Sequence, residues 1–162
     1  MILATSWSPI GLTANTINID ITTHLGDQQS YVEGDSIEFL INLSQDAYVL
    51  ILYIDAAGNI IQILPNRLVT NNFVTAGLYI NIPEQSAPFK FTVSAPFGRE
   101  TVWAYASKLP FPELSGKLLD NELKQLNLKL PKIKSILDLY FKKKKGTFSS
   151  SSLIIETTAT TQ

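Results

Sequence analysis

The amino-acid sequence predicts a mainly β protein, an immunoglobulin-like antiparallel β-sandwich with a helical excursion at about residues 113–146, before the last strand. Two patterns support this prediction. Apolar and polar residues alternate along several short segments, as expected for strands that bury one face. Turn-forming residues separate these segments at the short intervals that are typical of sandwiches. We expect residues 17–160 to form a single domain, preceded by a flexible segment at 1–16.

The strands are predicted in order along the first two-thirds of the chain. Residues 17–21 and 37–43 alternate in polarity, so each is expected to be half-buried. Residues 47–55 are almost entirely apolar, as a central strand covered on both faces would be. A turn at 55–59 leads into the next strand. Further strands are expected at 59–64, 78–82, 89–94, 101–106 and about 153–158, with a disordered Ser/Thr-rich tail as the alternative for the last of these.

The pattern changes from strand to helix after Pro110. Leu119, Leu123 and Leu126 recur at helical spacing. Pro131 suits the first turn of a second helix, and Gly146 is a natural stop for it. The apolar face of that helix is expected to consist of Ile133, Ile136, Leu137 and Tyr140.

Charge is distributed unevenly, although the net charge of the chain is only −1. Residues 1–89 hold one cation against eight acids, whereas residues 90–162 hold twelve cations against six acids. Between Lys124 and Lys145 there are eight lysines and one acid, Asp138. Such asymmetry favours a basic element that contacts a partner or a membrane, or attraction between copies of the chain.

Composition excludes several classes of protein. The sequence has no cysteine, which rules out disulfides, thiolate zinc sites and iron–sulfur clusters. The longest apolar run, Ala47–Ile54, is too short for a transmembrane helix, which needs roughly 20 residues. The first residues lack the basic and apolar regions of a signal peptide. Two localisations stay open: the cytoplasm, or the periplasm or cell envelope if a leader has been removed.

Four short motifs occur in order in the first two-thirds of the chain. They are Y-V-E-G-D at 31–35, an apolar strand that ends in D-A-A-G at 55–58, L-P-N at 64–66 and P-F-G-R-E at 96–100. Together they resemble a bacterial family known as domain of unknown function 4384, over roughly residues 17–107. The matching positions are Tyr31, Gly34, Asp35, Asp55, Gly58, Pro65, Asn66, Gly98 and Glu100. Ile63 and Leu64 stand before Pro65-Asn66, a small departure from the usual aromatic residue, and the basic helical insertion is not part of the family pattern.

The resemblance implies an accessory sandwich domain of bacterial envelope proteins, or one attached to proteases and kinases, and it implies no reaction. The motif residues also have an architectural reading. Gly34 and Gly58 permit positive φ in turns, and Asp35 and Asp55 can accept hydrogen bonds from turn backbone. We therefore expect these residues to be structural.

Catalytic groups are hard to find in the sequence. His24 is the only histidine, and no serine motif points to it. The Gly34-Asp35-Ser36 string is similar to the nucleophile block of GDSL hydrolases, but that chemistry needs a later histidine. Asp27, Glu33 and Asp35 surround one predicted loop and are weak candidates for calcium, without the spacing of an EF-hand. No enzyme activity and no cofactor are predicted.

Binding of other proteins is the function that the sequence favours. The leading hypothesis is a structural or interaction domain of a bacterial cell-envelope or secretion-type assembly, and a small-ligand or calcium-binding module is the alternative. Contact with a partner or a membrane is assigned to the lysine run Lys142, Lys143, Lys144 and Lys145. The simpler interpretation is that these lysines are solvated side chains at the end of a helix. Copies of the chain are partner candidates. Nucleic acid is not expected, because the sequence has two arginines and a pI near 5.8.

Overall fold

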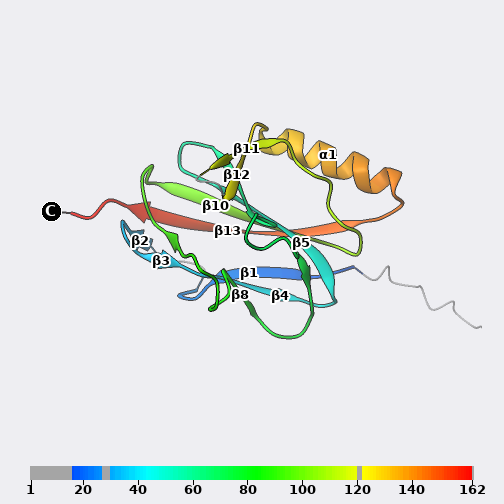
Figure 1. Ribbon diagram of the computed structural model, residues 1–162, viewed down its shortest axis with the longest axis horizontal. Helices are drawn as coiled ribbons and strands as arrows, with labels where there is room; N and C mark the ends of the chain where they lie inside the picture. The colour runs from blue at the N-terminus through cyan, green and yellow to red at the C-terminus, as the bar shows by residue number, and fades with distance from the viewer. Residues whose placement is uncertain (1–15, 27–29, 120–121, 162) are drawn as a thin grey trace, which may run out of the picture.

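The computed structural model describes residues 16–26, 30–119 and 122–161, which form three layers (Figure 1). A large sheet occupies the middle. Small sheets cover its inner face, and the single helix of the described part covers its outer face. The predicted mainly β sandwich, with a helix before the last strand, is confirmed.

The large sheet has the strand order β11-β12-β6-β5-β10-β13-β2 in the described part of the chain, with β7 also paired to β5. Its strands are β2 (Ser30–Val32), β5 (Ala47–Ile54), β6 (Ile60–Leu64), β7 (Phe73–Val74), β10 (Arg99–Ser107), β11 (Gly116–Leu119), β12 (Leu123–Leu126) and β13 (Phe148–Thr158). The facing strands are β1 (Ile19–Thr23), β4 (Phe39–Leu43) and β8 (Ile80–Ile82), together with the pair β3 (Ser36–Ile37) and β9 (Phe91–Thr92).

The central strand β5 is buried on both faces, as its apolar run predicts. Val49 and Ile51 belong to the core between the sheets, and Leu50 and Leu52 belong to a second core beneath the helix. All four side chains are at most 1% exposed. The two cores therefore lie on opposite faces of β5, and each requires its own cover.

Helix α1 (Leu130–Lys143) supplies the cover of the outer face. Pro131 lies in its first turn, and Ile133, Leu137 and Phe141 are buried at intervals of four residues. Ile136 and Tyr140 are partly buried against the same core, so the predicted apolar face is confirmed. Lys134 places its ammonium group 4.1 Å from the centre of the Trp103 ring of β10.

The expected helix around residues 119–126 is wrong, because this segment forms the β11–β12 hairpin. Leu119 pairs with Leu123 across the turn, and Leu126 pairs with Ile60 of β6. The edge of β6 otherwise has unpaired backbone groups, which a hairpin can satisfy and a helix cannot. The helical part of the 113–146 excursion is thus limited to α1.

The last strand rejoins the large sheet as predicted and is longer than expected. All of β13 up to Glu156 pairs antiparallel with β10. Its C-terminal end also pairs with β2 in parallel, a strand that the sequence pattern did not indicate. Residues 1–15 of the expected flexible segment lie outside the described residues, and no described helix is long and apolar enough to cross a bilayer.

The attachment of α1 to the sheet can be tested with two leucines of the same helix. Leu137 is fully buried, whereas Leu139 is 69% exposed. Replacing Leu137 with alanine should lower the free energy of unfolding by about 2–5 kcal/mol, because the substitution leaves a cavity in the core. Leu139→Ala should change it by less than about 0.5 kcal/mol. Urea unfolding of both variants measures the difference, and equal effects would show that the helix does not pack as described.

Candidate functional site

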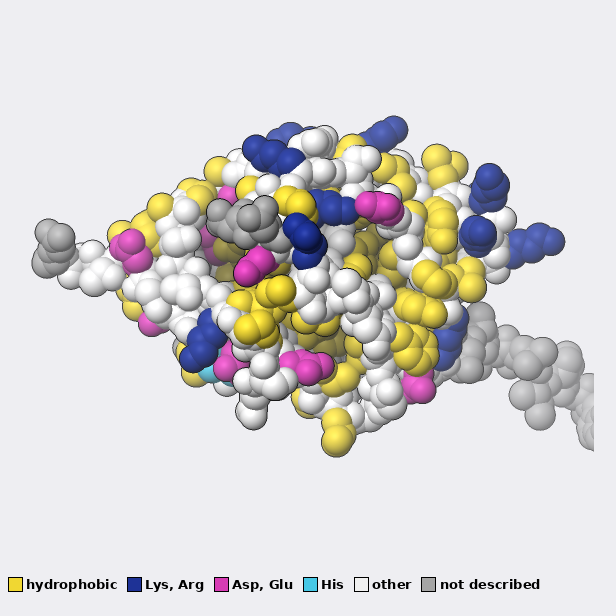
Figure 2. Space-filling model, viewed as in Figure 1, with side chains coloured by type: hydrophobic (Ala, Val, Ile, Leu, Met, Phe, Trp, Pro, Cys, Tyr) yellow, Lys and Arg dark blue, Asp and Glu magenta, His cyan; other side chains and the backbone are white. Residues whose placement is uncertain are grey.

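A slot opens into the core between the sheets, at the end of the sandwich where β5 finishes. It encloses about 380 Å³ between the segment 90–96, which contains β9, and the inner face of β5, β6 and β12. Its apolar walls include Ile37, Phe39, Ile61, Ile63, Leu119 and Leu123. In the space-filling view, apolar side chains show at the depth of a hollow near the centre, with acidic side chains beside it (Figure 2).

Carboxylates outnumber cations in the slot. Asp55, Glu100 and Glu122 line it, and Lys90 is the one lysine or arginine among its described lining residues. Glu100 is only 2% exposed, whereas Glu122 is exposed at the mouth. An acidic interior with apolar walls favours a ligand group that has an apolar body and a positive charge.

Tyr53 and Glu100 form the floor of the slot because both side chains point to the inner face of the large sheet. Tyr53 lies at the end of β5, opposite Val102 of β10, and Glu100 is two residues before Val102. The hydroxyl of Tyr53 donates a hydrogen bond to Oε2 of Glu100. This bond ties the end of β5 to the start of β10 across the opening of the core.

Burial raises the pKa of the Glu100 carboxyl, and hydrogen bonds with Tyr53, Thr157 and the Ala56 backbone oppose that rise. The negative charge of Asp55 adds to the increase. Burial also raises the pKa of the Tyr53 hydroxyl, and its hydrogen bond to Glu100 raises it further. The floor therefore holds a carboxylate whose charge is poorly solvated.

Two tight turns hold the rim of the slot in place. Oδ1 of Asp55 accepts hydrogen bonds from the backbone N–H groups of Ala57 (3.0 Å) and Asn59 (2.8 Å), and Gly58 has a φ of 82°. Gly98 has a φ of 143°, and its N–H donates to Oγ1 of Thr157 at 3.1 Å. A side chain at Gly98 would meet Cβ of Ala56 at 3.3 Å, so glycine also allows the two turns to approach.

The first motif, Y-V-E-G-D at 31–35, makes structural contacts near the slot. The buried hydroxyl of Tyr31 donates to Oγ1 of Thr23 at 2.7 Å and joins the two faces of the sandwich. Oδ2 of Asp35 accepts the N–H of Val32 at 2.8 Å. Gly34, with a φ of 91°, donates its N–H to the carbonyl of Val93 at 3.0 Å. The motif thus holds the segment that carries β9.

The third motif closes a loop after β6. The Leu64–Pro65 peptide bond is cis, and the Asn66 side chain bonds the backbone on both sides of its turn. Its Nδ2 donates to the carbonyl of Ile63 at 2.8 Å, and its Oδ1 accepts the N–H of Val69 at 2.7 Å. An asparagine here satisfies backbone groups that the loop leaves unpaired.

Comparison with known families matches residues 30–110 to a family model described as Domain of unknown function (DUF4384). The chain belongs to the DUF4384 family. No curated protein and no solved structure matches it. The matched region contains all four motifs, and two of them place a carboxylate, Asp55 and Glu100, in the slot.

Of the three calcium candidates, two fall within the described residues of this DUF4384 domain. Asp27 lies outside the described residues, Glu33 is exposed, and Oδ2 of Asp35 accepts a hydrogen bond from the N–H of Val32. Across residues 16–26, 30–119 and 122–161, no group of three His, Asp or Glu side chains is placed to hold a metal ion. His24 accepts the N–H of Glu38 through Nδ1 at 3.3 Å, and it is not among the residues that line the slot.

The lysine run lies at the C-terminal end of α1, where Lys142, Lys143, Lys144 and Lys145 are all exposed. Lysine and arginine side chains gather along the top and right of the space-filling view, on the side of the helix (Figure 2). Cations at this end of a helix are favoured by its dipole. The assignment of partner or membrane contact to these lysines stays a prediction.

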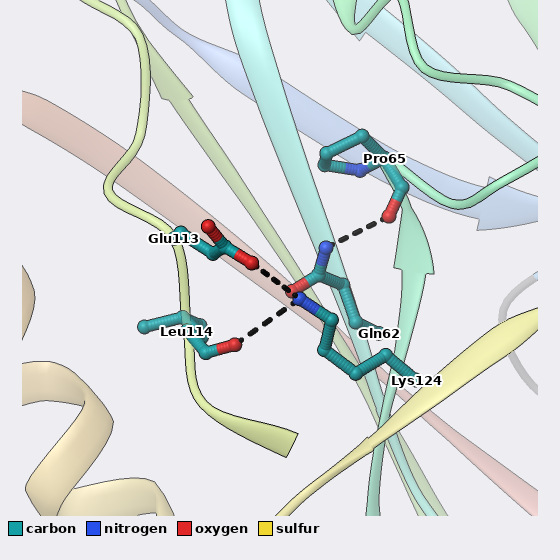
Figure 3. Close-up of polar contacts among 5 residues, drawn as sticks. All are labelled: Gln62, Pro65, Glu113, Leu114 and Lys124. Carbon is teal, nitrogen blue, oxygen red and sulfur yellow. Dashed lines mark hydrogen bonds and ion pairs between the residues drawn. The ribbon is translucent and has the colours of Figure 1, made fainter. Parts of the chain in front are cut away.

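A second cavity, of about 390 Å³, lies beside the β11–β12 hairpin and is lined by residues including Gln62 and Lys124. Several of its polar groups bind one another (Figure 3). Nζ of Lys124 lies 3.3 Å from both Oε1 of Glu113 and the carbonyl of Leu114, and Nε2 of Gln62 donates to the carbonyl of Pro65 at 2.8 Å. The Lys124 contacts anchor the hairpin to Glu113 and Leu114, and the Gln62 contact joins β6 to the loop after it, so these polar groups are already engaged and the first slot is the better candidate for a ligand.

Sequence reasoning singled out Asp55 and Glu100 only as motif positions expected to be structural, and it assigned no residue to the slot. Tyr53 lies within an apolar run, so it gave no separate signal. It is two residues before Asp55, and this spacing places both side chains on the same side of an extended chain. Leu123 was assigned to a helix, and the segment around Thr92 carried no signal beyond strand propensity. Neither segment could be placed at the slot without the pairing of the sheets.

The raised pKa of Glu100 predicts how stability depends on pH. In the folded state Glu100 binds its proton more tightly than at the ordinary value of 4.5, so protonation stabilises the fold. That contribution is complete below pH 4.5 and is lost as pH rises through the folded pKa. Glu100→Gln keeps an acceptor for Tyr53 and cannot ionise. Urea unfolding should therefore show the variant gaining stability relative to wild type between pH 4 and pH 8.

A wild-type protein that gains stability relative to Glu100→Gln over the same range would contradict this assignment. That result would mean that the ionised carboxylate is better stabilised by its hydrogen bonds than it is penalised by burial. Glu33→Gln is the matched control, because Glu33 is exposed and does not line the slot. Its stability relative to wild type should change little over the range.

Proposed function

We propose that this DUF4384 domain is a non-enzymatic protein-interaction domain that receives a segment of a partner protein in the slot. The observation that carries the proposal is the slot itself: a preformed opening into the core, with apolar walls, an acidic floor and one wall made by a strand segment. Openings of this kind bind ligands through apolar contact and a few oriented polar groups. The proposed setting, a bacterial cell-envelope or secretion-type assembly, rests on the family resemblance.

The chemistry of the slot supports binding more than catalysis. Glu100 is held by hydrogen bonds that join β5, β10 and β13, which is the arrangement of a carboxylate that organises a site. A general acid or base would need a reacting group beside it. His24 is engaged with Glu38 at another part of the surface. The proposal that the domain has no reaction of its own rests on these placements.

A small-molecule ligand is the second candidate function, and the volume of the slot favours it. The 380 Å³ cavity falls within the range of roughly 300–1,000 Å³ that is typical of small-molecule sites. The consecutive residues 90–96 all line the slot, which favours an extended occupant longer than the cavity. We therefore rank the protein segment first.

Site-specific photo-cross-linking in the native host tests this proposal. A benzoylphenylalanine at Thr92, an exposed residue that lines the slot, should form an adduct of discrete mass with one partner protein. The same residue at Thr75, which is exposed and does not line the slot, is the control. Leu123→Trp, which places a larger side chain at the slot wall, should reduce the Thr92 adduct at least severalfold.

The proposal fails if no adduct forms at Thr92, or if the adducts at Thr92 and Thr75 are the same. It also fails if Leu123→Trp leaves the Thr92 adduct unchanged while the variant unfolds at the wild-type urea concentration. In that case the partner would lie near Thr92 without entering the slot.

A further inference from the structure

The strand that forms one wall of the slot is paired along only one edge. In the described residues, β9 pairs with β3 and with no other strand. The N–H of Val93 donates to the carbonyl of Asp35 at 2.9 Å, and the carbonyl of Val93 accepts the N–H of Gly34 at 3.0 Å. Both backbone groups of Val93 therefore point toward β3.

The backbone groups on either side of Val93 point the other way. In an antiparallel ladder the N–H and C=O of successive residues face opposite edges of the strand. Thr92, the last residue of β9, thus directs its backbone groups away from β3, and the same alternation continued through Val93 places those of Ser94 on the same side. Both residues are exposed, and both line the slot. Across the described part of the chain, their N–H and C=O groups have no partner.

A free strand edge at an open slot is a template for an added strand. Unpaired N–H and C=O groups bind an extended segment through main-chain hydrogen bonds, and nearby pockets select alternate side chains. The pocket here lies directly beside the edge, since the segment 90–96 and the floor of Tyr53 and Glu100 line the same cavity. A strand added to β9 would present every second side chain to this pocket.

The charges of the slot select the side chain that enters it. Three carboxylates and one lysine line the slot, and its apolar walls are aliphatic and aromatic. Lysine and arginine have an apolar stem and a cationic head, so they match the walls and the floor at once. A cation near Glu100 would also offset the poor solvation of its charge.

We propose that the slot takes an extended segment of a partner protein, hydrogen-bonded to the free edge of β9 as an added strand, with one Lys or Arg side chain directed toward Glu100. This inference rests on the proposed function and names the chemistry of its partner. A partner of this kind needs an accessible segment of only a few residues in extended conformation.

A library of random seven-residue peptides, displayed on phage and selected on the full-length protein, provides the probe. Enriched peptides should share one Lys or Arg, flanked by residues with high strand propensity. Their affinity, measured by fluorescence anisotropy, should then be compared across three variants. Thr92→Pro removes an outward N–H, Thr92→Val keeps it, and Glu100→Gln removes the charge at the floor.

Thr92→Pro should weaken binding about tenfold, through the lost hydrogen bond and the bulk of the ring at the edge. Proline is tolerated at an edge position whose N–H is not bonded within the sheet, so the variant is expected to fold. Thr92→Val should stay within about twofold of wild type. Glu100→Gln should abolish the preference for Lys or Arg over glutamine at the shared position.

The inference is overturned if Thr92→Pro and Thr92→Val bind the enriched peptides equally, or if those peptides carry no basic residue. It is likewise overturned if no peptide is enriched. This holds even if the small amine agmatine binds the protein and its binding depends on Glu100, because such binding would show a cation site without an added strand. The proposed function has its own criterion, the cross-linked adduct at Thr92. A Thr92 adduct combined with Thr92→Pro binding peptides normally would retain the interaction domain and reject strand addition.

Discussion

Burial of both faces of β5 and β10 is the constraint on which the rest of the structure depends. Val49 and Ala104 belong to the core between the sheets, and Leu50 and Tyr105 belong to the core beneath the helix. Apolar surface removed from water stabilises a fold by roughly 25 cal/mol per Å², so neither face of these strands can remain open. The small sheets cover one face and α1 covers the other (Figure 1).

The slot follows from uneven cover of the inner face. The large sheet extends beyond β5 through β6 and the β11–β12 hairpin, where the facing strands are the short β3 and β9. Ile61 and Leu123 therefore remain only partly buried. A buried carboxylate is tolerated at this margin because Tyr53 hydrogen-bonds it. The same shortage of cover leaves the outer edge of β9 without a partner strand among the described residues.

Most of the fold could be predicted because local patterns determine it. Period-2 alternation indicated β4, a continuous apolar run indicated the doubly covered β5, and Pro131 with a four-residue apolar interval indicated α1. The hairpin was missed because Leu119, Leu123 and Leu126 have spacings of four and three, which suit a helix face. Backbone pairing with β6 decided between the two structures, and that pairing is not local.

The candidate site was harder to predict for the same reason. Tyr53 and Glu100 are 47 residues apart, and β2 joins β13 across more than 120 residues. Asp55 and Gly98 could be recognised as turn residues from their types. Their convergence on one cavity, and the free edge of β9 beside it, depend on the order of strands in the sheets.

Amide hydrogen exchange at three consecutive residues tests the central claim most directly. Val93 is bonded to Asp35, whereas Thr92 and Ser94 face outward at the slot. In the free protein, Val93 should exchange slowly, and Thr92 and Ser94 should exchange quickly. When the partner segment is bound, Thr92 and Ser94 should slow by tenfold or more, and Val93 should change little. Protection of Thr92 and Ser94 in the free protein, or rapid exchange of both in the complex, would contradict strand addition at this edge.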